Sequence, residues 1–361
     1  MTEPGAAPVP TPDGPETLES LPDLLARVGL GGVTEEPFPN DGWSGASLTL
    51  LRRDDEATFV LKRDSLDRDW IARATRDGPL LREAWFAARG PALPEPLAAP
   101  YLGAARDGVD QTILMPDLSG VLFDWDAPVT GEAVEVVLAA IGELHAAYAS
   151  EAARRRLAGG PWCPLAERLT LISRASLERP GPARDAVASR ILPGWDAFDR
   201  LTPRAVRDVV DGLGRDPAPL LAAFDALPAT LLHGDLKLAN AGIGADGAVP
   251  LVDWQMTLVA PVAVELGWLL VSNTAALPFH PSDVLARYYA TTSEAGTRAG
   301  TDPIGDWTRQ VDAAVLVGLV LRGWRKGYDA EAGLILASGM TAAEDLAWWC
   351  EAAEHAAGRL L

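Results

Sequence analysis

Two short apolar runs that end in polar side chains constrain this chain more than any other feature. The first is LLHGDLKLAN at 231–240, and the second is VPLVDWQ at 249–255. Each run reads as a short strand, whereas every other element expected after Gly120 is a helix. Polar residues that follow such strands lie on loops, where catalytic and binding side chains are common.

The order of the predicted elements indicates an α+β chain with two unequal parts. Strands are expected at 46–53 and 57–63, a helix at 80–89 and a hairpin at 100–115. After Gly120 we expect helices at about 131–150, 164–176, 183–200, 203–213, 217–226, 262–274, 281–293, 303–326 and 341–358, with short strands near 229–232 and 249–253. We predict a disordered tail at 1–20, an N-terminal lobe at 21–118, a connector at about 115–120 and a helical lobe at 119–361.

Charge and composition exclude several classes of function. The net charge of −19 argues against nucleic acid and against an anionic membrane surface as partners. Two distant cysteines indicate neither a disulfide framework nor a zinc site, and with no signal-like start they favour a cytoplasmic location. The longest apolar run, at 313–321, is too short to cross a bilayer and is closed by Arg322.

Asp235, Asn240 and Asp253 form a pattern that suits phosphoryl transfer. Such a reaction needs a carboxylate to orient the acceptor hydroxyl and oxygen ligands for the metal that bridges the phosphates. Asp253 follows the second strand, and a hairpin between the two strands would bring it beside Asn240. Two carboxylates and one amide then suit one base and two metal ligands. The alternative for Asp235 and Asn240 is that each only caps a turn.

The two motifs resemble those of a known enzyme family. HGDLKLAN at 233–240 is similar to the catalytic loop of the aminoglycoside phosphotransferases and choline-kinase-like small-molecule kinases, relatives of the protein kinases, and LVDWQ at 251–255 resembles their metal-binding Asp motif. The resemblance covers about 40–275. It implies a protein-kinase-like fold, with a small antiparallel sheet and one helix in the N-lobe and a larger, mostly helical C-lobe. It also implies Asp235 as the catalytic base, and Asn240 and Asp253 as Mg²⁺ ligands.

The resemblance also assigns residues around the nucleotide. Lys62 in FVLKR matches the strand lysine that holds the phosphates, and Glu83 in LLREAW matches its helix partner. Lys62, Lys237 and Lys326 are the only lysines among 31 basic residues, which favours a selected role for Lys62. The alternatives are an ordinary edge-strand lysine and a solvated glutamate, because Glu83 lies off the expected Leu81–Trp85 stripe.

The predicted nucleotide site includes a glycine-containing loop and the connector. NDGWSGAS at 40–47 lacks the full glycine pattern of protein kinases, so hydroxyls such as Ser44 would replace it, although a plain hairpin turn fits equally well. The resemblance puts the connector residues Met115, Asp117 and Leu118 against the adenine through backbone hydrogen bonds.

Lys237 and its neighbours allow more than one role. Lys237 could neutralise charge growing on the transferred phosphate, or it could be a surface lysine. We expect His233 to brace the loop. Glu265 is expected to support the loop without contacting the reacting groups, and His145 is assigned no chemistry. The segment 63–78 either closes over the phosphates or is a solvated insertion, which we favour. The stretch 343–355 near the end of the chain is either part of the hydrophobic core, which we favour, or part of an acceptor pocket.

The predicted function is an ATP- or GTP-dependent, Mg²⁺-requiring phosphotransferase that acts on a hydroxyl of an aminoglycoside, sugar, amino alcohol or related metabolite. The alternative is a nucleotide-binding pseudokinase with a regulatory role, which would need a damaged catalytic set. A metal hydrolase built on His233 and Asp235 lacks the further His or Cys ligands that such a site requires.

Overall fold

The N-terminal lobe is built on a mixed β-sheet whose strands alternate in burial. The computed structural model of the chain describes residues 18–38, 42–53, 56–124, 127–179 and 182–361. The strand order is β1-β6-β7-β4-β3-β2, with β1 parallel to β6 and the other pairs antiparallel. Successive side chains of a strand point to opposite faces. Leu51 and Leu61 are therefore buried under α1, while Leu50 and Val60 pack on the face that α3 covers.

The elements of this lobe are β1 (Glu19–Ser20), α1 (Leu21–Arg27), β2 (Thr34–Pro37), β3 (Ser47–Arg53), β4 (Glu56–Asp64), α2 (Trp70–Ala74), α3 (Arg82–Arg89), β5 (Leu97–Ala98), β6 (Gly103–Asp107) and β7 (Asp110–Pro116). The hairpin predicted at 100–115 is formed by β6 and β7, and its turn holds Gly108 at a φ of 63°. Residues 1–17, most of the predicted tail, lie outside the described residues.

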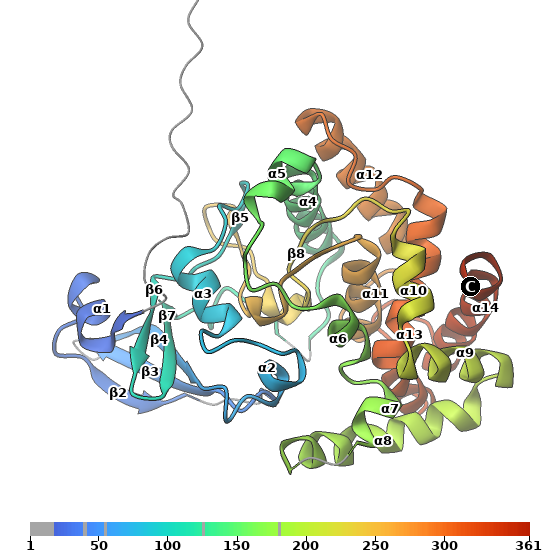
Figure 1. The fold of residues 1–361 in the computed structure, drawn as a ribbon, viewed down its shortest axis with the longest axis horizontal. Coiled ribbons are helices and arrows are strands. Elements are labelled where there is room, and N and C mark those ends of the chain that lie inside the picture. The colour runs from blue at the N-terminus through green and yellow to red at the C-terminus, as the bar shows by residue number, and fades with distance from the viewer. Residues whose placement is uncertain (1–17, 39–41, 54–55, 125–126, 180–181) are drawn as a thin grey trace, which may run out of the picture.

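The C-terminal lobe is mostly helical. Its elements are α4 (Gly131–Tyr148), α5 (Glu151–Arg156), α6 (Leu165–Thr170), α7 (Arg174–Leu177), α8 (Pro182–Leu201), α9 (Arg204–Arg215), α10 (Ala218–Phe224), β8 (Thr230–Leu232), η1 (Leu238–Asn240), β9 (Val249–Pro250), η2 (Trp254–Met256), β10 (Leu258–Ala260), α11 (Ala263–Ser272), α12 (Pro281–Ala299), α13 (Trp307–Glu331) and α14 (Ala342–Leu360). Figure 1 shows the sheet at one end of the molecule and these helices at the other, with β8 between α3 and α11. The α+β two-lobe fold is therefore confirmed.

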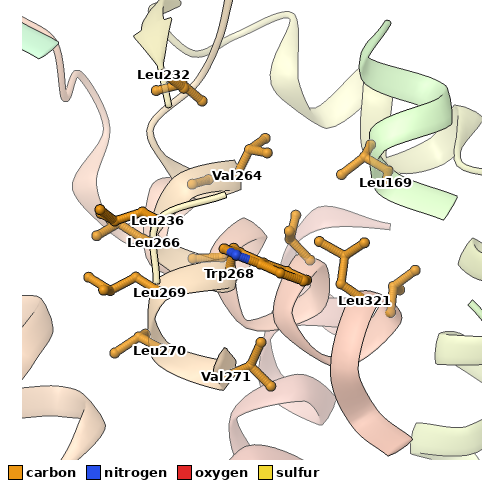
Figure 2. Packing of buried hydrophobic residues seen from close by; sticks show 14 of the residues in the cluster. Leu169, Leu232, Leu236, Val264, Leu266, Trp268, Leu269, Leu270, Val271 and Leu321 are labelled. Atoms are coloured by element: carbon orange, nitrogen blue, oxygen red, sulfur yellow. The ribbon is translucent and has the colours of Figure 1, made fainter. Parts of the chain in front are cut away.

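Helix α13 is the centre of the helical lobe, where it packs against α8, α11 and α14. The two backbones of α11 and α13 approach closely, because a Cβ on Gly267 would lie 2.4 Å from the carbonyl oxygen of Ala314. In Figure 2, Trp268 extends from α11 toward Leu321 on α13, with Leu169 of α6 beyond it. This packing fixes α11 directly behind the loop that follows β8.

The two strands predicted beside the polar motifs exist, but their pairing is not local. β8 pairs with β10, a strand that the sequence analysis missed, and β9 pairs in parallel with β5 of the N-terminal lobe. A single bridge joins Ala241 to Leu251, and the N–H of Val252 donates to the carbonyl oxygen of Asn240. The start of the Asp253 motif is thereby held beside the end of the catalytic loop.

Two local expectations were wrong. The segment 63–78 is not a solvated insertion, because it contains α2 and buries Asp69, Trp70 and Ile71. The inner face of α3 is not an apolar Leu81–Trp85 stripe, because Arg82 and Glu83 are buried there. In both places the sequence pattern predicted that polar residues would be exposed. Ion pairs and hydrogen bonds to backbone oxygens make the burial of these polar residues possible. In the part of the chain that is described, no helix is both long and apolar enough for a membrane span.

Candidate active site

Lys62 joins the two lobes through two carboxylates. Its Nζ on β4 donates to Glu83 Oε2 on α3 at 2.6 Å and to Asp253 Oδ1, beyond β9, at 2.8 Å. The Lys62 and Glu83 side chains are only 13% and 7% exposed. Burial alone would lower the pKa of Lys62, but the charges of Asp253 and Glu83 raise it above its ordinary value. The lysine is therefore held as a cation at the base of the interlobe cleft.

Tyr101 is a part of this network that sequence reasoning missed. Its hydroxyl donates to Glu83 Oε1 at 2.8 Å and accepts from the N–H of Asp253 at 3.0 Å. Asp253 itself has a φ of 68°, a left-handed conformation that non-glycine residues adopt infrequently. Against the effect of burial, Lys62 and Lys237 hold the pKa of Asp253 below its ordinary value. Nothing local in the sequence around Tyr101 signals this contact.

The loop after β8 is fixed from behind by Glu265 of α11. Its two carboxylate oxygens accept the N–H groups of His233 at 2.8 Å and of Gly234 at 2.9 Å. Gly234 has a φ of 82°, and a Cβ there would lie 2.0 Å from the carbonyl oxygen of Met256. Only glycine fits this position. The glycine between His233 and Asp235 is therefore required by the geometry of the backbone.

His233 braces the loop with both of its ring nitrogens. Nδ1 accepts from the N–H of Asp235 at 3.2 Å, and Nε2 lies 2.9 Å from the carbonyl oxygen of Val252. A single tautomer, protonated on Nε2, satisfies both contacts. With both nitrogens occupied and the side chain fully buried, His233 links the two motifs and has no atom left for acid–base chemistry.

Asp235 presents one carboxylate oxygen with no internal partner. The residue is 1% exposed, and its Oδ2 accepts from Lys237 Nζ at 2.9 Å. Oδ1 is buried and has no hydrogen-bond partner among the described residues. Buried polar atoms are normally paired, so an orphaned carboxylate oxygen in this loop is a candidate contact to a substrate.

The donor set around Asp253 and Asn240 fits a magnesium ion. The Asn240 amide nitrogen donates to the backbone carbonyl of Asp235 at 2.9 Å, which leaves the amide oxygen as its ligand atom. Asp253 uses Oδ1 for Lys62. No cluster of three or more His, Cys, Asp or Glu side chains suited to a metal occurs among the described residues. A pair of hard oxygen ligands suits Mg²⁺, which keeps several waters and binds substrate phosphates as well.

Ser44 lies in a loop that packs on the segment 63–78. Its Oγ accepts from the N–H of Ala46 at 3.3 Å, and its side chain is 9% exposed. Gly45 has a φ of 109°, and a Cβ there would lie 2.9 Å from the carbonyl oxygen of Arg68. The ring of Trp43 in the same loop lies 6.4 Å from that of Trp324 on α13. The loop therefore contacts both lobes, and positions 40 and 41 of the predicted motif lie outside the described residues.

The connector residues are arranged around a turn. Met115 is buried in β7 opposite Val60. Asp117 Oδ1 accepts from both the N–H and the hydroxyl of Ser119, so this side chain shapes the connector. The carbonyl oxygen of Leu118 accepts from the N–H groups of the third and fourth residues after it. These three residues lie together at the end of β7 and in the turn that follows it.

Three further residues hold the site together and were not predicted. Arg82 donates to the carbonyl oxygen of Gln255 on η2, and Arg168 of α6 donates to the carbonyl oxygen of Gly234. Asn273, at the end of α11, accepts from the N–H of Leu238. Each acts on a backbone atom far away in the sequence, so no local motif marks it.

The chain is similar to one protein family and to several solved structures. The sequence matches the phosphotransferase enzyme family over residues 38–303. No curated protein matches it. Similar solved structures include a macrolide 2′-phosphotransferase from Brachybacterium faecium (20% identity, 91% of this chain and 96% of that chain covered, TM-score 0.39), an aminoglycoside phosphotransferase from Alicyclobacillus acidocaldarius (14%, 91% and 92%, 0.38) and a choline kinase from Streptococcus pneumoniae (10%, 92% and 98%, 0.45). The chain therefore belongs to the phosphotransferase enzyme family.

Proposed function

We propose that this phosphotransferase moves the γ-phosphoryl group of ATP or GTP, with Mg²⁺, to a hydroxyl group of a small molecule. The bond between the γ-phosphorus and the β–γ bridging oxygen breaks, and a bond from the acceptor oxygen to the γ-phosphorus forms. The hydroxyl proton goes to Asp235, and the nucleoside diphosphate leaves. Such transfers depend mainly on positioning and on electrostatic stabilisation, with one carboxylate to align the acceptor.

The orphaned Oδ1 of Asp235 is the observation that carries this proposal. It is a buried carboxylate oxygen with no internal hydrogen-bond partner, in a loop that Glu265 and His233 hold rigid. Its other oxygen accepts a hydrogen bond from Lys237, which orients the carboxylate. An acceptor hydroxyl that donates to Oδ1 would give this oxygen the hydrogen-bond partner that it lacks within the protein.

The remaining residues have roles that follow from their contacts. Lys62 would hold the phosphates, and the Glu83 and Asp253 carboxylates keep its ammonium charged and fixed. Asn240 and Asp253 would hold Mg²⁺, which when bound would neutralise negative charge on the phosphates. The backbone of Met115 and Leu118 would contact the base. Lys237, beside Asp235, would face the transferred group.

The test compares Asp235→Asn with Asp225→Asn, a matched control on an exposed residue. Nucleoside diphosphate release from ATP or GTP is measured against a panel of hydroxylated metabolites and antibiotics with Mg²⁺. Loss of a catalytic base typically costs about 10²- to 10⁴-fold in rate. We expect that loss in kcat for Asp235→Asn, nucleotide affinity within a few-fold of the wild type, and no change in the control.

The outcomes separate the alternatives. An unchanged kcat in Asp235→Asn would remove Asp235 from its assigned role. Tight Mg²⁺-dependent nucleotide binding by the wild type, without turnover of any acceptor, would favour the nucleotide-binding pseudokinase. Absence of nucleotide binding would refute the proposal as a whole.

A further inference from the structure

A pocket that does not include Lys62 lies beside the catalytic loop. It is bounded by Leu238 and Ala239 after Asp235, by residues 272–276 at the end of α11, and by Arg322 and Arg325 of α13. Its empty space, open solvent included, measures about 490 Å³. Leu238 and Ala239 belong to the same loop as Asp235, and the charge of Asp235 acts on Arg322, so we take this pocket as the space available to an acceptor.

Arg322 is the unusual residue of this pocket. It interrupts the helical geometry of α13, with φ −140° and ψ 24°, and its side chain is 6% exposed. It forms no ion pair within the described parts of the chain, and its buried Nε has no hydrogen-bond partner there. A buried cation without a partner is costly, and such groups are normally paired.

The next cations along the same helix behave differently. Arg325 is paired with Asp329 at 2.8 Å, and Lys326 with Asp345 at 2.7 Å. Both of these cations therefore have a carboxylate within hydrogen-bond distance, from α13 for Arg325 and from α14 for Lys326. Arg322 has none among the described residues, although the charges of Asp235 and Asp329 act on it from further away. We infer that a partner at hydrogen-bond distance comes from a bound molecule.

The surroundings of Arg322 add to its positive charge. Its guanidinium carbon lies 5.4 Å from the ring centre of Trp268, which also faces Arg168 at 4.4 Å and the ammonium of Lys237 at 5.8 Å. Arg168 is fully buried, donates to a backbone carbonyl, and has an unpartnered Nη1. Among the lining residues the one carboxylate is Asp124, which is exposed at the rim.

The same guanidinium also lies near a contact between the two lobes. It lies 5.2 Å from the ring centre of Trp324, which is 6.4 Å from Trp43 in the loop of the N-terminal lobe. Burial, with the neighbouring Arg325, lowers the pKa of Arg322 to about 10, so it remains charged at neutral pH. An ammonium group on an acceptor would meet repulsion here, whereas an anionic group would find a preformed cationic partner.

We propose that the acceptor carries an anionic group, a carboxylate or a phosphate ester, which Arg322 binds while the acceptor's hydroxyl faces Asp235. The inference rests on the proposed function, since it identifies the pocket with the acceptor site. It favours hydroxy acids and sugar acids or phosphates over polycationic antibiotics and choline-like amino alcohols.

The test uses molecules with one skeleton and different charge: gluconate and glucose 6-phosphate as anions, glucose as the neutral member and glucosamine as the cation. Binding is measured by calorimetry with a non-hydrolysable nucleotide and Mg²⁺, and turnover by nucleoside diphosphate release. The variants are Arg322→Gln, Arg322→Lys and, as a matched control, Arg204→Gln, whose side chain is 85% exposed.

We expect an anionic member to bind the wild type more tightly than glucose and glucosamine. Because a hydrogen-bonded charge pair is lost, Arg322→Gln should weaken that binding by about 10- to 100-fold. Arg322→Lys should restore part of it, and the KM for nucleotide should not change. In the absence of acceptor the melting temperature of Arg322→Gln should be no lower than that of the wild type, because an unpaired buried charge is removed.

The results distinguish this inference from the proposed function. If anions bind no better than glucose or glucosamine, including the case in which none binds, the inference is wrong. It is also wrong if Arg322→Gln melts well below the wild type or changes the nucleotide KM alone, since Arg322 would then be a structural or nucleotide-binding residue. Failure of the wild type to bind nucleotide would instead refute the proposed function. If gluconate binds more tightly than glucose 6-phosphate, the site is specific for a carboxylate. If glucose 6-phosphate binds more tightly, the site is specific for a phosphate.

Discussion

Replacing Glu265 by glutamine tests how the catalytic loop is held. The glutamate is 1% exposed and accepts two backbone N–H groups, from His233 at 2.8 Å and from Gly234 at 2.9 Å. Glutamine keeps one oxygen for the first of these donors, but its amide NH₂ then faces the other N–H. One charge-assisted bond is lost and one buried donor is left unsatisfied. The free energy of unfolding should therefore fall by about 2–4 kcal/mol.

The loss can be measured by urea unfolding followed by tryptophan fluorescence. Glu351→Gln, which makes the same chemical change on an exposed face of α14, is the matched control and should change little. The proposed turnover should also fall in Glu265→Gln, because the backbone that carries Asp235 is released. A stability within about 0.5 kcal/mol of the control would refute the reasoning, since surface changes have effects of that size.

The effect of this substitution should depend on pH in a defined direction. Burial opposes the charge of Glu265, but the nearby His145 side chain and the hydrogen bond from the Gly234 N–H hold its pKa below the ordinary value. A carboxyl whose pKa is depressed on folding stabilises the protein above its unfolded pKa, about 4.3, and loses that contribution as the pH falls through the folded pKa. The difference between wild type and Glu265→Gln should therefore shrink as the pH falls below about 4.

Further predictions concern backbone fit and a buried acid pair. Gly234→Ala should destabilise the fold by about 2–4 kcal/mol, measured by the same unfolding assay, because its Cβ would overlap the carbonyl of Met256 at a positive φ; wild-type stability would contradict this. Burial and the charge of Asp64 raise the pKa of Asp69 to about 7, so the folded state holds a proton that the unfolded state has released. Stability should therefore fall as the pH rises from about 4 to 7. Asp69→Asn keeps the cap of α2 and should flatten that slope in melting temperatures; an equal slope in both proteins would contradict it.

The sequence by itself determined the two motifs and the order of elements around them. Short apolar runs before Asp235 and Asp253, in an otherwise helical half, predicted loops on short strands, and the family resemblance implied the fold. These features are local, because periodicity, glycine positions and the spacing of polar residues depend on neighbours along the chain. The prediction that Lys62 and Glu83 meet rested on the resemblance, since the helix pattern put Glu83 on the wrong face.

The tertiary structure alone decided which distant groups complete the site. Tyr101 bridges Glu83 and Asp253, and Glu265 fixes the backbone ahead of Asp235, across separations that no spacing rule covers. Arg322 looked like the residue that closes a buried apolar run. Whether a buried charge has a partner depends on every element packed around it. Only the fold could show that this guanidinium lies unpaired beside the catalytic loop.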